Sequence, residues 1–184
     1  MDIEKIKAQV RVNQYVYTHH AEIERRADEL TFAQVEEALL NGEILEQYPD
    51  TGRGESCLVV GFAEDVPIHA VCGWRGEKVA LITVYIPRPP KLLTPGHEER
   101  GAMRKVQCNF CGRDRYEERR IEYLYSYKGE YLLVPNTPVE VCLNCGMVYY
   151  DAAVLKEIER RFFAIQHKAE KPDRYIEMPA MAYA

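Results

Sequence analysis

Two short cysteine pairs carry the most specific chemistry in the sequence. Cys108 and Cys111 form one C-x2-C pair, Cys142 and Cys145 form the other, and a glycine follows each pair. Each C-x2-C turn presents two thiolates on one tight loop, and two such turns can complete a tetrahedral shell around zinc. Because four thiolates leave no coordination position open for water, we expect one structural Zn²⁺ and no catalytic metal.

The alternatives are a redox dithiol and a set of unrelated buried thiols. A redox C-x-x-C needs only one pair, which usually follows a strand and opens a helix. The duplicated pair, with thirty residues between its two copies, favours a metal site. Bound zinc contributes on the order of 10 kcal/mol to the folding of a small domain. We therefore expect chelation to unfold residues 106–165 and to leave the N-terminal unit folded.

His20, His69 and Tyr85 form a second group, the candidate catalytic residues. Two histidines with near-neutral pKa values can act as general base and general acid. A metal-independent ribonuclease needs that pair, because the 2′-hydroxyl must lose a proton and the leaving 5′-oxygen must gain one. Arg25 or Arg26 could stabilise the charged phosphorane. In the competing interpretation His69 is a structural residue of its strand, and spacing alone does not decide between the two.

Regular patterns in residues 1–90 predict an α+β unit that would position these side chains. Four strand-like runs predict an antiparallel meander: EILEQY, SCLVVGF, PIHAVCGW and KVALITVYI. Two helices precede the meander and are expected to pack on it. One covers residues 20–29, and the other begins at Thr31, whose capping-box partner is Gln34, and stops at Gly42.

The C-terminal half reads as a smaller zinc-binding unit. Residues 91–105 are rich in proline and charge and are expected to be a linker. Residues 106–168 form the zinc-binding domain, in which alternating side chains predict a β-hairpin that turns at Lys128 and Gly129. A C-terminal helix completes it, and the tyrosine-rich hairpin face is expected to pack on that helix. The charged stretch before the hairpin is expected to be a solvated loop, and residues 169–184 a tail.

Charge and hydropathy exclude several classes of partner. The chain has 184 residues and a net charge of -5, with the acidic excess in its N-terminal half. Neither half has a long basic surface, so DNA is not an expected partner. RNA would need a local patch, for which the candidates are Arg25, Arg26, Arg75 and Lys78. No run of about 18 uncharged apolar residues and no signal peptide are present, so we expect a cytoplasmic protein without a membrane span.

Three segments of the zinc-binding unit go together: CNFCG, YSYKGEYLLVPNTP and VEVCLNCGMVYYDAAVLKEIE. They resemble a YgiT-type zinc finger, the zinc-binding domain of MqsA-like antitoxins, over about residues 106–165. In such antitoxins a helix-turn-helix DNA-binding domain follows the zinc domain, whereas 39 residues follow Cys145 here. The resemblance therefore implies binding of a toxin-like protein, or a homodimer, rather than operator binding.

The N-terminal unit contains HHAEIERRADELTFAQVEEALLNGEILEQYPD, ESCLVVG, VPIHAVCG and LITVYIP. These segments resemble the domain-of-unknown-function 4258 family over about residues 14–90. The resemblance implies a toxin-like partner of YgiT-type zinc fingers, with a RelE/ParE-like fold by analogy. Many members carry arginines where this chain has Glu24 and Asp28. The positions that match the family are His20, Asp28, Gly42, Tyr48, Pro49, Ser56, Cys57, Gly61, Pro67, His69, Thr83, Tyr85 and Pro87.

Two hypotheses follow for the function. In the first, a toxin-like ribonuclease domain is fused to its antitoxin-like zinc finger, which docks within the same chain, covers the catalytic residues and inhibits them. In the second, the chain is a non-enzymatic interaction module with a degenerate N-terminal fold stabilised by zinc. Convergence of His20, His69 and Tyr85 favours the first hypothesis, whereas burial of both histidines among apolar strands favours the second.

Overall fold

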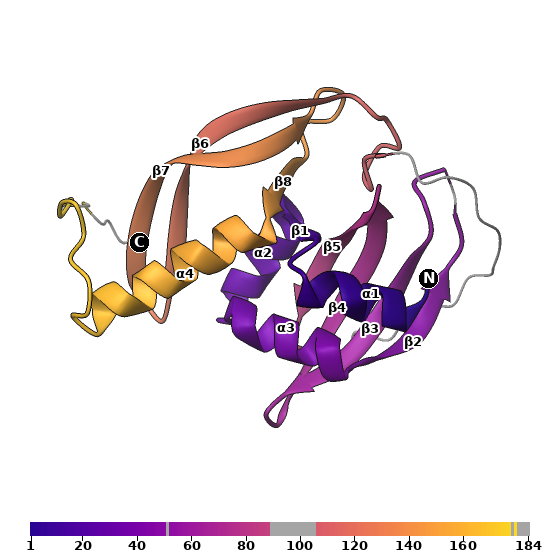
Figure 1. Ribbon diagram of the computed structural model, residues 1–184, viewed down its shortest axis with the longest axis horizontal. Helices are drawn as coiled ribbons and strands as arrows, with labels where there is room; N and C mark the ends of the chain where they lie inside the picture. The colour runs from indigo at the N-terminus through magenta and orange to yellow at the C-terminus, as the bar shows by residue number, and fades with distance from the viewer. Residues whose placement is uncertain (51, 89–105, 178, 180–184) are drawn as a thin grey trace, which may run out of the picture.

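The computed structural model of the protein describes residues 1–50, 52–88, 106–177 and 179 (Figure 1). These residues form four helices and one mixed sheet of eight strands, which confirms the α+β class. The predicted linker, residues 91–105, lies outside the described residues. In chain order the elements are α1 (Ile3–Arg11), β1 (Tyr15–Thr18), α2 (His19–Ala27), α3 (Phe32–Asn41), β2 (Glu43–Tyr48), β3 (Ser56–Ala63), β4 (Val66–Arg75), β5 (Lys78–Tyr85), β6 (Tyr116–Tyr127), β7 (Glu130–Cys142), β8 (Val148–Asp151) and α4 (Ala152–Gln166).

The eight strands follow the order β2-β3-β4-β5-β1-β8-β7-β6. The strands β2 to β5 form the expected antiparallel meander, and β6 pairs with β7 in the expected hairpin. Between them lies β1, which pairs parallel to β5 and antiparallel to β8. The sheet is therefore continuous between the two halves of the chain. Among the described helices, none is long and apolar enough to cross a membrane.

The helices α1 and α3 cover one face of the meander (Figure 1). The start of α3 carries the predicted capping box, in which the Thr31 side chain and the Gln34 side chain each accept a backbone amide of the other residue. A small residue in β3 allows α3 to approach closely. A Cβ atom on Gly61 would lie 1.9 Å from the carbonyl oxygen of Ala38, so only glycine fits there.

The hairpin of β6 and β7 packs on α4. Asp151 caps this helix by accepting a hydrogen bond from a backbone amide of its first turn. The ring centroids of Tyr125 and Phe162 lie 4.8 Å apart, so the tyrosine face packs on the helix as expected. One expectation is wrong: β6 begins at Tyr116, and the charged stretch 117–120 is strand rather than loop. Pairing with β7 satisfies the backbone groups on one edge of this stretch, while its side chains remain exposed to water.

A buried polar network joins α2 to the hairpin. The fully buried guanidinium of Arg25 donates two hydrogen bonds to the Glu22 carboxylate, at 2.8 and 2.9 Å. Glu22 also accepts a hydrogen bond from the hydroxyl of Tyr123 in β6. The Arg25 cation lies 4.1 Å from the centroid of the Phe32 ring. Because a buried charge needs such partners, this group tightly couples the two halves.

A second buried carboxylate joins α4 to α3. The two oxygens of Glu159 accept the amide of Phe32 at 3.0 and 3.1 Å, and one of them accepts the hydroxyl of Tyr125 at 2.7 Å. Phe32 is the first residue of α3, so the carboxylate lies at the positive end of the helix dipole. The C-terminal helix therefore caps a helix of the N-terminal half.

Candidate metal centre and acid-base cluster

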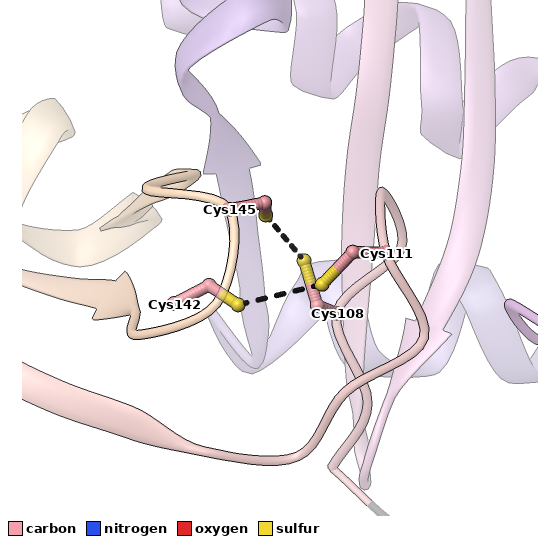
Figure 2. A group of neighbouring side chains, drawn as sticks. All are labelled: Cys108, Cys111, Cys142 and Cys145. Atoms are coloured by element: carbon pink, nitrogen blue, oxygen red, sulfur yellow. Dashed lines mark hydrogen bonds between the residues drawn. The ribbon is translucent and has the colours of Figure 1, made fainter.

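The structure brings the four cysteines of the two C-x2-C turns into one cluster (Figure 2). The sulfur atoms of Cys108 and Cys145 lie 3.6 Å apart, as do those of Cys111 and Cys142. All four lie within 4.8 Å of one another. Zinc bound to four thiolates at about 2.3 Å places neighbouring sulfur atoms about 3.8 Å apart. The cluster therefore has the size and the ligands to bind one metal ion.

Identical backbone turns position the two pairs. In the first, the Cys108 amide donates to the carbonyl of Arg113 at 2.7 Å, and the Gly112 amide donates to the carbonyl of Cys108 at 2.8 Å. The second turn repeats both bonds at 2.9 Å around Cys142. Gly112 has a φ of 73° and Gly146 a φ of 76°, in the left-handed region that favours glycine. The glycine after each pair thus explains why the sequence forms this loop twice.

Hydrogen bonds reach the sulfur atoms of Cys111 and Cys108, whereas burial raises the pKa of the Cys145 thiol to about 12. Burial acts to raise the pKa of Cys111, but hydrogen bonds, first of all from the backbone of Arg113, outweigh it and lower the pKa to about 7. The hydroxyl of Tyr149 donates to the sulfur of Cys108 at 3.3 Å. Such hydrogen bonds orient sulfur ligands and stabilise their charge. Tyr149 was not predicted, because nothing in its local sequence distinguishes it from other strand tyrosines.

The metal centre lies against the N-terminal half. The side-chain amide of Asn109, inside the first cysteine pair, donates to the carbonyl of Trp74 at 3.2 Å. A Cβ atom on Gly112 would lie 2.5 Å from the carbonyl oxygen of Gly52, so this turn is in close contact with the loop before β3. The metal centre therefore does not lie within the C-terminal unit alone, because the turn that carries Cys108 and Cys111 also contacts the N-terminal half.

The candidate catalytic residues gather on the meander face opposite α1 and α3. His69 in β4 pairs with Tyr85 in β5, and the imidazole Nδ1 lies 3.3 Å from the tyrosine hydroxyl. His20 is 55% exposed, and its Nε2 lies 3.5 Å from the carboxylate of Glu24, one turn later on α2. Glu24 in turn accepts the hydroxyl of Thr83, two residues before Tyr85 in β5. The structure thus brings His69 and Tyr85 into contact, whereas His20 contacts Glu24 and is connected to β5 through the bond between Glu24 and Thr83.

Burial sets the protonation of the His69 and Tyr85 pair. Desolvation lowers the pKa of His69, so its imidazole is neutral near pH 7. Desolvation also raises the pKa of Tyr85, and the nearby carboxylates of Glu24 and Glu46 raise it further. A neutral imidazole thus lies beside a protonated phenol. The neighbouring histidine, His19, faces away from this pair, with its Nδ1 at 3.3 Å from the hydroxyl of Tyr150.

One of the comparisons with known proteins identifies this part of the chain. Residues 17–86 match a protein family, the domain of unknown function DUF4258. This confirms the resemblance of the N-terminal segment, and the match contains His20, His69 and Tyr85. The comparisons with curated proteins and with solved structures gave no significant match.

The four cations named as candidates for an RNA-binding patch do not gather on one exposed surface. Arg25 and Arg75 are buried, with 0% and 5% of their surface exposed, and cannot reach a phosphate on the surface. Arg26 donates to the Ser126 hydroxyl at 3.2 Å, and Lys78 pairs with Asp151 at 2.7 Å. The sequence suggested exposed cations, whereas each of these side chains has a partner within the fold.

The metal centre and the acid-base cluster lie at opposite ends of β4 and β5. Arg75 and Lys78 pair beside the cysteines, whereas His69 and Tyr85 pair at the far end of the same two strands. The six-residue separation of His69 and Arg75 corresponds to about 20 Å of strand. That the zinc-binding unit covers His69 and Tyr85 stays a prediction.

Proposed function

We propose that the chain is a zinc-binding fusion in which the DUF4258 segment cleaves RNA without a catalytic metal. The observation that carries the proposal is the contact between His69 and Tyr85, with Glu24 linking His20 to the same face. This arrangement offers two imidazoles on one surface, one of them held neutral by burial. Such a pair could supply the general base and the general acid that RNA cleavage through the 2′-hydroxyl requires.

The proposed reaction uses each group once. Neutral His69 takes the proton of a ribose 2′-hydroxyl, and Tyr85 orients the imidazole through its hydroxyl. The 2′-oxygen attacks phosphorus, and the bond from phosphorus to the 5′-oxygen breaks. His20, whose Nε2 lies 3.5 Å from the Glu24 carboxylate, acts as the general acid and gives a proton to the leaving 5′-oxygen. The products are a 2′,3′-cyclic phosphate and a free 5′-hydroxyl, and the second step of hydrolysis is not required.

The C-terminal unit is proposed to bind one structural Zn²⁺ through its four cysteines and to act as the antitoxin-like part. In this proposal the C-terminal unit is a YgiT-type zinc finger, and the N-terminal unit is a toxin-like domain with a RelE/ParE-like fold. Support comes from the network around Glu22 and Arg25, which holds α2 against Tyr123. His20 lies on the same helix, so docking restrains the catalytic group and keeps the ribonuclease inhibited within the fusion. The fused units remain docked because their effective concentration is high.

Cleavage of a mixed-sequence RNA by the zinc-loaded chain, without added divalent cations, tests the proposal. His69→Asn is expected to reduce the rate about 100-fold or more. The matched control is His167→Asn, which changes an exposed histidine at the end of α4 and should leave the rate unchanged. Tyr123→Phe removes a hydrogen bond to Glu22 and should raise the rate several-fold by releasing α2. Because the wild type is proposed to be inhibited, the deciding comparison is made in the released chain: equal rates for Tyr123→Phe and for the double variant Tyr123→Phe, His69→Asn would refute catalysis.

A specific observation favours the second candidate function, a non-enzymatic module that binds another protein. Arg25 and Arg75 are buried, and the carboxylates of Glu24 and Glu46 lie near Tyr85. An acidic surface repels an RNA backbone. If the wild-type chain and Tyr123→Phe both leave RNA intact and bind none of it at low salt, this second function replaces the first.

A further inference from the structure

A buried arginine of the N-terminal half lies beside the cysteine cluster. Arg75, at the end of β4, is 5% exposed. Its guanidinium lies against two aromatic rings, 4.2 Å from the centroid of Tyr116 and 4.5 Å from that of Tyr149. One of its nitrogens forms an ion pair with Glu140 of β7. Its Nε and second terminal nitrogen are buried and have no hydrogen-bond partner among the described residues.

The same two rings border the sulfur ligands. Tyr149 donates its hydroxyl to Cys108, and both rings pack with Cys108 and Cys142 in one small cluster of buried residues. Burial raises the pKa of Tyr116, while the Arg75 cation acts to lower it and the sulfur atoms act to raise it. Tyr116 thus lies near both the Arg75 cation and the cysteine sulfur atoms.

The Arg75 cation can compensate the negative charge of a zinc-loaded cysteine site. A zinc ion with four thiolates carries two net negative charges. Two of the ligands, Cys108 and Cys142, are buried, and uncompensated charge is costly on that side of the site. Glu140 is 43% exposed, so water screens its charge and leaves part of the Arg75 charge free to act on the cluster. We propose that Arg75 is the electrostatic partner of the metal-loaded four-thiolate site. The DUF4258 segment would then supply a positioning residue to a metal site whose ligands all lie outside it.

The inference rests on zinc binding by the four cysteines and is independent of RNA cleavage. Its test is the zinc dissociation constant of the full chain, measured by competition with a chromophoric chelator. Arg75→Met is expected to weaken zinc binding about tenfold or more, as loss of an outer partner of a metal site typically does. Arg75→Lys keeps the charge and should stay within about threefold of the wild type. The control is Arg115→Met, an exposed arginine near the first cysteine pair, and should change nothing.

Glu140→Gln separates the electrostatic role from a merely structural ion pair. It leaves the Arg75 charge uncompensated, so zinc should bind at least as tightly as in the wild type. If the ion pair only holds the fold, Glu140→Gln and Arg75→Met should weaken zinc binding equally, and that result would overturn the proposal. The cobalt-substituted spectrum of each variant reports whether a tetrahedral sulfur site forms. If Arg75→Met does not fold, the zinc dissociation constants of Arg75→Lys and Glu140→Gln decide the question. Zinc binding tenfold weaker than in the wild type in either variant contradicts the inference. A wild-type chain that binds no zinc refutes the metal site itself.

Discussion

Glu159→Ala is expected to lower the free energy of unfolding of the whole chain by about 3–5 kcal/mol. The alanine would leave two buried donors, the Phe32 amide and the Tyr125 hydroxyl, without their charged acceptor. Each hydrogen bond to a buried charge contributes about 1.5–3 kcal/mol. The loss should lower the melting temperature by roughly 10 °C for a chain of this size. Glu159→Gln keeps one carbonyl acceptor and should fall between the alanine variant and the wild type.

Urea unfolding followed by two signals measures this effect. The chain has a single tryptophan, Trp74, which is buried in β4 and reports on the N-terminal half, while far-UV circular dichroism reports on all elements. The urea midpoints from both signals should move together in Glu159→Ala, because Glu159 joins α4 of the C-terminal half to α3 of the N-terminal half. Glu157→Ala, an exposed change on the same helix, should leave both midpoints in place. An unmoved Trp74 transition in Glu159→Ala would refute the coupling of the two halves.

Two further predictions concern the metal and the pH. Removal of zinc with a strong chelator should change the Trp74 emission, because Asn109 bonds the Trp74 carbonyl; loss of ellipticity with an unchanged emission would instead support unfolding of residues 106–165 alone. Burial lowers the pKa of His69 in the folded chain, so the unfolded chain binds more protons at this residue as pH falls. The contribution of His69 to stability is therefore present above about pH 6.5 and is lost as pH falls through the lowered pKa of the folded state. The decline in unfolding free energy between about pH 7 and pH 5 should therefore be shallower in His69→Asn; an equal slope in both proteins would contradict that assignment.

Local chemistry explains which features the sequence could predict. The cysteine pairs, each followed by glycine, and the capping box of Thr31 and Gln34 depend on residues a few positions apart, so their patterns are visible without the fold. The hairpin turn at Lys128 and Gly129 is of the same kind, and Lys128 has a φ of 47° there. These features specify elements and a ligand set, but not how the elements meet.

The contacts between the N-terminal and C-terminal halves depend on residues that are distant in sequence. The strand β8 has four residues, too few for a clear pattern, and it becomes a strand because it pairs with β1. Glu22 and Arg25 read as an ordinary exposed pair on a helix, and only the cover of Tyr123 and Phe32 makes them buried. The partners of Arg75 are likewise supplied by another part of the chain, so the sequence alone leaves Arg75 as a candidate for an exposed basic patch.

The central place of β1 has a consequence for biosynthesis. This strand is made early, yet one of its edges pairs with β8, which is made near the end of the described chain. Until residues 148–151 leave the ribosome, the backbone groups of Val16 and its neighbours on that edge lack their partner. An unpaired central edge is a template for wrong pairing, and late non-local closure slows folding. A chain interrupted before β8 should therefore be prone to aggregation and to recognition by chaperones.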